Sequence, residues 1–232
     1  MIAVTFALPA ESSEFLRRLR DRTGSERNGL RIVRGNIAGQ TIEVLHTGVG
    51  EKVCRQRVGN FLENQQFDIL ISTGFAGALN DELQVGDLLL AKNFLTVDLN
   101  ERPSLFSSFP IHMANLLTVP AVIDSSEERD KIARASGAAA VDMETEFIAR
   151  ACAEHGVPLL SLRVITDTPR QPFPAPMKVL FDMERQRTDY RQLFSHVLKN
   201  PMMLWRLLRF GIGVAHARKA LTEAIVDLVR NV

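Results

Sequence analysis

Short apolar runs alternate with longer segments of helical period along this chain of 232 residues. Gly, Pro or Asp residues bound the runs, and after the first run Phe15, Leu16 and Leu19 recur at helical spacing. Strands as apolar as these are buried on both faces, and such strands alternate with helices in α/β proteins. The pattern therefore predicts an α/β fold with a largely buried sheet.

The expected strands are the apolar runs 2–8, 31–37, 41–45, 67–72, 88–91, 116–123, 138–141 and 159–165. The expected helices begin near residue 10, near residue 50, at the polar start 124–127 and at 142–155, and two or three more finish the chain. The sequence of residues 98–115 predicts a loop that could act as a lid. The prolines of residues 171–176 indicate an extended backbone there.

Composition places the chain among globular proteins, at 46% hydrophobic and 24% charged residues. A length of 232 residues fits one domain spanning 1–232. Cys54 and Cys152 lie in separate segments without metal-ligand spacing, so we expect neither a disulfide nor a zinc site, and a reducing compartment. The short apolar N-terminus lacks the features of a secretory signal, and a cytoplasmic location is expected.

Charge is divided unevenly although the formal net charge is only +1. Residues 185–232 carry nine Lys or Arg against three Asp or Glu, which leaves 19 against 24 in residues 1–184. The basic tail contains an apolar segment, 201–214, interrupted by Arg206 and Arg209. This segment of about 199–219 could lie in a membrane interface, or pack against its own domain or a partner subunit. Nothing in it indicates nucleic-acid binding.

Unusual residues follow several of the predicted strands. Glu11 follows the first, Gly48 and Gly50 another, Gly74 to Gly77 a third, and Asp167 ends the most apolar one. Ligands of open α/β sheets bind outside the carboxyl ends of the strands, where loops and helix N-termini converge. Each residue has a simpler interpretation as a turn or first-turn residue, but together they indicate a site.

Glu144 heads a helix after the strand 138–141, and Phe147, Ile148 and Ala151 share its helix face. A buried carboxylate needs hydrogen-bond donors, because its uncompensated burial costs several kcal/mol. The donors could belong to the protein or to ligand hydroxyls. Alternatively, Glu144 caps its own helix.

The residues around these positions resemble the purine nucleoside phosphorylase superfamily, and within it the methylthioadenosine/S-adenosylhomocysteine nucleosidase branch. The segments that carry the resemblance are 47–50, 73–79, 85–87, 141–146 and 163–167. The resemblance covers about residues 1–168 and implies a three-layer α/β/α sandwich with a central mixed, partly barrel-like sheet. It also implies a homodimer, and no cofactor or metal.

Roles for individual residues follow from this resemblance. Asp167 matches the aspartate that donates a proton to purine N7, and Glu11 matches the glutamate that activates the attacking water. Glu144 matches the glutamate that binds the ribose hydroxyls, and Met143 the residue that packs on the ribose. The further positions that the resemblance places at the substrate are Phe75, Ala76, Gly77, Asp142 and, for the base, Val122 and Ile123.

Two departures favour hydrolysis over phosphorolysis. Phe75 stands where the family has a small polar residue, and residues 7–11 lack the arginine that phosphorylases use for phosphate. Arg34, Lys52 and Arg55 could still supply positive charge for phosphate, so a phosphorylase is the alternative. A third interpretation is a binding protein that kept the fold without the activity.

The substrate is expected to be a purine nucleoside, with adenine as the base and a 5′ substituent. The chain is about 30 residues shorter than the nucleosidase branch between Gly86 and Asp142, and the basic apolar tail of about 185–232 is an addition. In this tail it is similar to hopanoid-associated nucleosidase or phosphorylase proteins, which act on adenosylhopane. A large hydrophobic 5′ group is therefore expected, with peripheral contact to the inner membrane surface.

Overall fold

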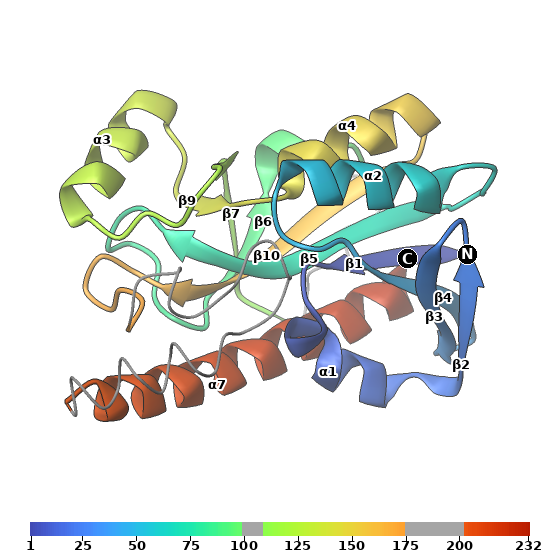
Figure 1. Cartoon of the computed structure of the whole chain (residues 1–232), viewed down its shortest axis with the longest axis horizontal. Helices are drawn as coiled ribbons and strands as arrows, with labels where there is room; N and C mark the ends of the chain where they lie inside the picture. Colours follow the sequence, from blue (N-terminus) through green and yellow to red (C-terminus); the bar gives the residue numbers. More distant parts are fainter. Residues whose placement is uncertain (99–108, 175–201) are drawn as a thin grey trace.

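The computed structural model describes residues 1–98, 109–174 and 202–232, the last range without the side chains of 202–204 (Figure 1). Its strands are β1 Ile2–Phe6, β2 Arg20–Arg27, β3 Leu30–Ile37, β4 Gln40–His46, β5 Ile69–Ala78, β6 Leu88–Ala91, β7 Ile111–Ala114, β8 Leu116–Thr118, β9 Ala140–Asp142 and β10 Leu159–Asp167. Its helices are α1 Pro9–Arg18, α2 Glu51–Leu62, α3 Ser126–Ser136, α4 Thr145–His155 and α7 Met202–Asn231, with a 3-10 turn at Lys92–Phe94.

One mixed sheet organises the molecule, in the order β2-β3-β4-β1-β5-β10-β6-β7. Strands β4, β1, β5 and β10 run parallel, whereas β6 pairs antiparallel with β10. The sheet branches at β5, because β9 pairs antiparallel with the last two residues of β5 and carries β8 on its other side. The branch brings the end of β9 to the same place as the carboxyl ends of β5 and β10.

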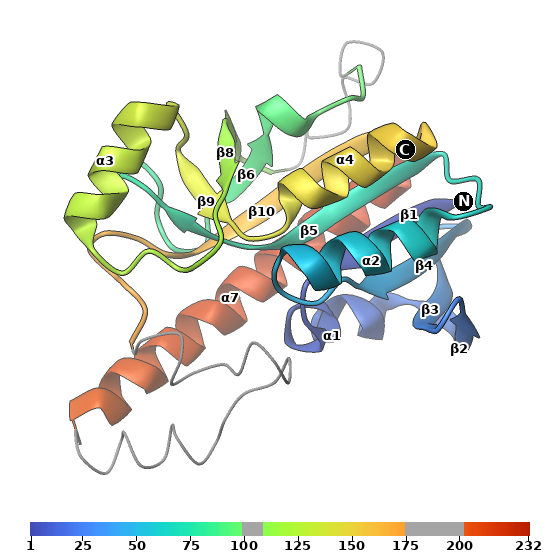
Figure 2. The ribbon, with the colours of Figure 1, turned by 45° about the horizontal axis from the view of Figure 1, so that its top comes forward.

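Helices cover both faces of this sheet, which confirms the predicted α/β architecture. Helices α2 and α4 pack side by side on one face through buried residues such as Cys54, Phe61 and Ile148. On the opposite face α1 and α7 pack through Phe15 and Leu221, and Figure 1 shows α7 running along most of the sheet. Helix α3 lies at the end of the sheet beside β8 and β9 (Figure 2).

Several predicted elements differ from the structure, and the strand expected over 116–123 ends at Thr118. The strand expected to end at Ser72 continues to Ala78, because pairing with β10 carries the backbone through the glycine motif. Residues 111–114 form β7 within the predicted loop, by pairing with β6, while 99–108 lie outside the described residues. Strand β2 was missed because it contains no apolar side chain. Helix α4 begins at Thr145, whose N–H is bound by the Asp142 carboxylate.

Helix α7 is the described part of the predicted C-terminal helices, and residues 175–201 lie outside the described part. Its C-terminal half contributes Ala217, Leu221 and Ile225 to the main core. Its N-terminal half is more exposed, with Trp205 at 70% and Ile212 at 62% exposure. Of the helices within the described ranges, none has the length and apolar character needed to cross a bilayer.

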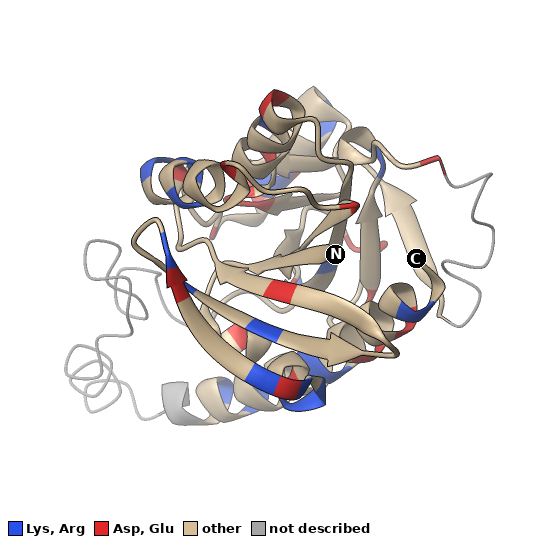
Figure 3. Ribbon diagram, turned by 90° about the vertical axis from the view of Figure 1, so that its right-hand side faces the viewer, with Lys and Arg blue, Asp and Glu red and all other residues tan. Residues whose placement is uncertain are grey.

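Most of the charged residues lie at the surface, whereas the two thiols are buried. In Figure 3 the Lys, Arg, Asp and Glu residues gather mostly on the helices and edge strands, and the interior strands carry few. Cys54 of α2 and Cys152 of α4 are free thiols, buried in the core between these helices and the sheet. Burial raises the pKa of both thiols, that of Cys152 to about 12. Neither thiol is ionised near neutral pH.

Candidate active site

A cavity of about 340 Å³ lies where β5, β9 and β10 end. The ten residues that the family resemblance places at the substrate or in catalysis all border it: Glu11, Phe75, Ala76, Gly77, Val122, Ile123, Asp142, Met143, Glu144 and Asp167. The remaining lining is mostly apolar and comes from Ala7, Leu8, Val49, Val119, Ala121, Arg129, Val141, Thr166, Phe173, Phe210 and Val214. Buried acids facing a largely apolar cavity are typical of a ligand or active site.

Glu11 lies in the first turn of α1 and is 7% exposed. One of its carboxylate oxygens, Oε2, accepts hydrogen bonds from the backbone N–H groups of Ala7 at 2.9 Å and Leu8 at 3.3 Å. Burial nevertheless raises the pKa of Glu11 to about 7, against the effect of these hydrogen bonds and of the Arg163 charge. A carboxylate with this pKa can exchange a proton near neutral pH.

The raised pKa of Glu11 predicts a pH-dependent stability. Ionisation is less favourable in the folded state, so stability present below the unfolded pKa of about 4.5 is lost as pH rises to about 7. Glu11→Gln keeps an oxygen for both N–H groups but cannot ionise. We expect the variant to gain on the order of 3 kcal/mol over wild type at pH 8, and nothing at pH 4. Urea unfolding at both pH values measures this, and an equal gain at both would contradict it.

Two glycines of β5 let carboxylates approach the backbone. A Cβ at Gly77 would lie 2.8 Å from Oδ2 of Asp167, closer than atoms can pack. Gly74 has a φ of +156°, and a Cβ there would lie 3.3 Å from Oε2 of Glu11. The glycine motif therefore provides space for the two acids, which is a more specific role than a tight turn.

Glu144 does not cap its own helix. It occupies the N-cap position of α4, but its side chain makes no capping hydrogen bond. Instead Oε1 accepts from the backbone N–H of Gly50, at the start of α2, over 3.4 Å. The pKa of Glu144 is raised to about 8, mainly by burial and also by the charges of Asp142 and Glu11, while the charge of Arg163 lowers it. This one long hydrogen bond leaves the carboxylate with capacity for ligand donors.

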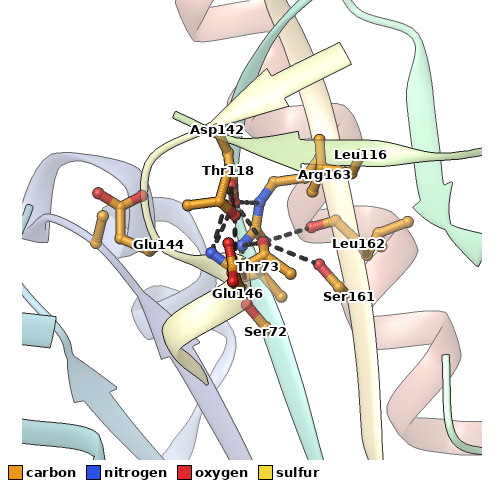
Figure 4. A network of polar contacts seen from close by, with 12 residues as sticks. Ser72, Thr73, Leu116, Thr118, Asp142, Glu144, Glu146, Ser161, Leu162 and Arg163 are labelled. Carbon is orange, nitrogen blue, oxygen red and sulfur yellow. Dashed lines mark hydrogen bonds and ion pairs between the residues drawn. The ribbon is translucent and has the colours of Figure 1, made fainter. Parts of the chain in front are cut away.

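Asp142 and Arg163 form a buried ion pair behind the cavity (Figure 4), with Arg163 Nε 3.0 Å from Asp142 Oδ2. Arg163 also donates to Ser72 at 2.8 Å and to Thr145 at 2.7 Å. The Asp142 carboxylate accepts from Thr118 and Thr145 as well. Its oxygens are thus engaged by the protein, and Figure 4 shows Glu144 pointing away from this network. The network fixes the segment that presents Met143 and Glu144.

Asp167 ends β10 and is 2% exposed. Its Oδ2 accepts from Arg129 Nη2 at 2.5 Å, and Oδ1 accepts from the Thr166 hydroxyl at 3.2 Å. Burial raises the pKa of Asp167, whereas the charge and hydrogen bond of Arg129 lower it. Arg129 could not be singled out from the sequence, because it lies among the polar residues of α3 and nothing in that pattern marks it as buried.

The C-terminal helix contributes to the cavity wall. Phe210 and Val214 of α7 border the cavity, and the Phe210 ring packs against Phe173 with 5.1 Å between centroids. None of these three residues was singled out in the sequence. Their apolar character was the available signal, but it did not indicate which part of the chain they contact.

Positive charge for a phosphate ion is scarce at the cavity. Arg34, Lys52 and Arg55 are exposed and do not border it, and Arg55 pairs with Glu51. Among the described residues that line the cavity, Arg129 is the one Lys or Arg, and its charge is paired with Asp167. The residues around the cavity therefore offer no described cation free to bind phosphate.

The chain matches the sequence model of the phosphorylase superfamily over residues 1–122 and 110–199. Its curated relatives include the 5′-methylthioadenosine/S-adenosylhomocysteine nucleosidase of Staphylococcus epidermidis, 24% identical over 72% of this chain and 86% of the relative. A protein of the same name from Shewanella halifaxensis is 22% identical over 72% of this chain and 85% of its own.

Solved structures share the fold at low sequence identity. A putative 5′-methylthioadenosine/S-adenosylhomocysteine nucleosidase from Borrelia burgdorferi, bound to adenine, superposes with a TM-score of 0.75 over the whole of both chains at 17% identity. A futalosine hydrolase mutant from Helicobacter pylori covers 71% of this chain and 88% of its own, with a TM-score of 0.63 and 19% identity. These likenesses confirm the expected sandwich with its mixed central sheet.

Proposed function

Because the chain belongs to the phosphorylase superfamily, we propose that it is a nucleosidase, an enzyme that hydrolyses the N-glycosidic bond of a purine nucleoside. The observation that carries the proposal is the position of three buried acids, Glu11, Glu144 and Asp167, around one cavity. The curated relatives described above are named as nucleosidases. Adenine is the proposed base.

The three acids supply the three requirements of glycoside cleavage. Ionised Glu11 takes a proton from water as the water oxygen bonds to C1′ of the ribose. The C1′–N9 bond breaks, its electron pair moves into the purine, and protonated Asp167 gives its proton to N7. Glu144 accepts hydrogen bonds from the ribose hydroxyls, which favour its ionised form, and its negative charge stabilises the cationic sugar of the transition state.

Adenine release from 5′-methylthioadenosine, with and without inorganic phosphate, tests the reaction class. A hydrolase forms adenine and the free ribose product in phosphate-free buffer, and phosphate does not raise its rate. Strict dependence on phosphate would favour the phosphorylase alternative. Specific binding of the nucleoside without any cleavage in either buffer would favour the non-catalytic alternative.

A large hydrophobic group on the 5′ position is the finer part of the proposal, with adenosylhopane as one example. Support comes from the apolar wall that Phe173, Phe210 and Val214 add to the cavity. A 5′ alkyl chain against this wall would bury apolar surface worth about 25 cal/mol per Å².

Phe210→Ala is therefore expected to affect long 5′ groups selectively. We expect kcat/KM to fall about tenfold or more for adenosines with long 5′ alkyl groups, and less than about threefold for methylthioadenosine. The matched control is Met113→Ala, an apolar truncation on β7 that is 53% exposed and does not border the cavity. Equal losses for all 5′ groups in Phe210→Ala would contradict this assignment.

The exposed stripe of α7 is proposed to contact an anionic lipid surface. Trp205, Leu208 and Ile212 share one helix face, and the exposed Arg206 and Arg209 lie beside them. Trp205 is the single tryptophan of the sequence, so its fluorescence reports on this stripe directly. We expect a blue shift with phosphatidylglycerol vesicles and none with phosphatidylcholine vesicles. An unchanged spectrum with both would contradict the proposal.

The homodimer stays a prediction from the family resemblance, and the cytoplasmic location stays a prediction from the N-terminal sequence and the cysteines. Light scattering of the purified protein measures the first directly, and cell fractionation measures the second. A membrane-bound fraction released by high salt would agree with the peripheral lipid contact.

A further inference from the structure

Arg129 is the largest of the fully buried side chains, at 1% exposure, and its guanidinium borders the cavity beside Asp167. Nε donates to the carbonyl of Ile123 at 3.0 Å, and Nη1 donates to the carbonyl of Ala78 at 2.7 Å. These two carbonyls belong to the segment before α3 and to the end of β5. They hold the guanidinium in place independently of its third contact, the Asp167 carboxylate.

Asp167 is confined from two sides by this arrangement. Arg129 holds Oδ2, and the backbone of Gly77 lies so close that a Cβ would meet the carboxylate at 2.8 Å. A carboxylate held by a fixed guanidinium on one side and a glycine backbone on the other has little freedom to rotate. Proton transfer to one particular nitrogen of a bound purine requires such a fixed position.

Arg129 also affects the acid strength of Asp167. A carboxyl group buried without a cation is a weak acid, because burial disfavours its ionised form. A general acid works best when its pKa lies near the working pH, so a neighbouring guanidinium improves a buried acid by lowering its pKa. The pKa of Asp167 is raised by burial, and the charge and hydrogen bond of Arg129 partly offset this rise.

The other charged groups around Asp167 have smaller effects on its pKa than Arg129 has. Asp124, ahead of α3, raises the pKa of Asp167 and is the weakest of its causes. Arg170, in the loop after β10, is exposed and pairs with Asp81 at 3.0 Å. From β5 the backbone of Gly77 faces the carboxylate, and the described α7 residues at the cavity are Phe210 and Val214, which carry no charge. Arg129 is therefore the dominant ionic neighbour of Asp167.

We propose that Arg129 is a positioning residue for the proposed nucleosidase reaction: it fixes the carboxyl group of Asp167 and makes it a stronger acid toward the departing purine. The inference rests on the proposed function. It adds a residue that acts through Asp167 and touches neither the ribose nor the attacking water.

Arg129→Met tests the inference through the pH profile of kcat. Removing the guanidinium raises the pKa of Asp167, so the carboxyl stays protonated to higher pH. We expect the basic limb of the profile to move up by about one pH unit or more, the acidic limb set by Glu11 to stay in place, and kcat at pH 7 to fall at least about tenfold. The matched control is Arg134→Met on the same helix, an exposed arginine near Asp130, with no expected change. A uniform loss with both limbs in place would overturn the inference.

A double-mutant cycle with Asp167→Asn separates positioning from a structural role. If Arg129 acts through Asp167, Arg129→Met costs little further activity in the Asp167→Asn background. Multiplicative losses would show that Arg129 acts independently, and would also overturn the inference. If Arg129→Met does not fold, Arg129→Gln removes the charge while keeping a donor for the carbonyls, and carries the same test.

A measurement without turnover distinguishes this inference from the proposed function. The carboxyl carbon of Asp167, observed by NMR in protein labelled at aspartate and assigned by its loss in Asp167→Asn, is expected to titrate at higher pH in Arg129→Met than in wild type. An unchanged titration would overturn the effect of Arg129 even in an active enzyme. A shifted titration in a protein that cleaves no nucleoside would instead count against the proposed function.

Discussion

Replacing Asp167 with asparagine is expected to lower kcat for purine release by at least about a hundredfold, the lower end of the usual contribution of a general acid. The asparagine oxygen can accept from Arg129 and its NH2 group can donate to the Thr166 hydroxyl oxygen, so the side chain can hold its position. What it lacks is the proton for N7. The departing base would then leave as an anion, which is the less stable leaving group.

Single-turnover measurements of adenine release, with substrate binding followed separately, isolate this effect. The control is Asp130→Asn on α3, an exposed acid outside the cavity, which should leave the rate within about twofold of wild type. Wild-type kcat in a folded Asp167→Asn variant would exclude Asp167 as the acid. It would also remove the basis for the role of Arg129.

The second large effect is expected on the free energy of unfolding when Arg163 is replaced. Arg163→Met is expected to lower the free energy of unfolding by about 3 to 5 kcal/mol at pH 7, because it leaves the buried carboxylate of Asp142 without its cation. The hydroxyls of Ser72 and Thr145 lose a donor as well. Urea unfolding followed by circular dichroism gives the magnitude.

Arg150→Met is the matched control for this prediction. Arg150 pairs with Glu146 on the same helix that follows Asp142, but its side chain is 59% exposed. Surface pairs of this kind contribute about 0 to 1 kcal/mol, so the same substitution should cost little there. Equal losses in the two variants would mean that the buried network does not stabilise the fold.

The alternation of apolar runs predicted most of the fold because buried parallel strands need continuous apolar sequence. Where a strand forms only through hydrogen bonds to a neighbouring strand, the pattern of apolar residues did not predict it. Strand β2 has no buried residue and exists through its register with β3, and β7 exists through its pairing with β6. The end of β5 looked like a loop because glycine usually marks turns, whereas here it accommodates two acids.

The candidate site was predictable as far as its acids were concerned. Glu11, Glu144 and Asp167 each follow a strand, and the topology brings strand ends together. The cation beside Asp167 was not predictable, since Arg129 becomes buried through long-range packing of α3 against the end of β5. The same holds for Phe210, a residue of α7 that lies 43 residues after Asp167 in the sequence and borders the cavity.

The two buried thiols can report when the helices α2 and α4 separate from the sheet. Because Cys54 and Cys152 are covered by packed helices and remain un-ionised, a thiol reagent in solution reacts with them only after the helices separate. The rate of labelling therefore measures how often α2 and α4 leave the sheet. A single cysteine introduced on an exposed surface would, by contrast, react at once, so a dye could be attached there without replacing either native residue.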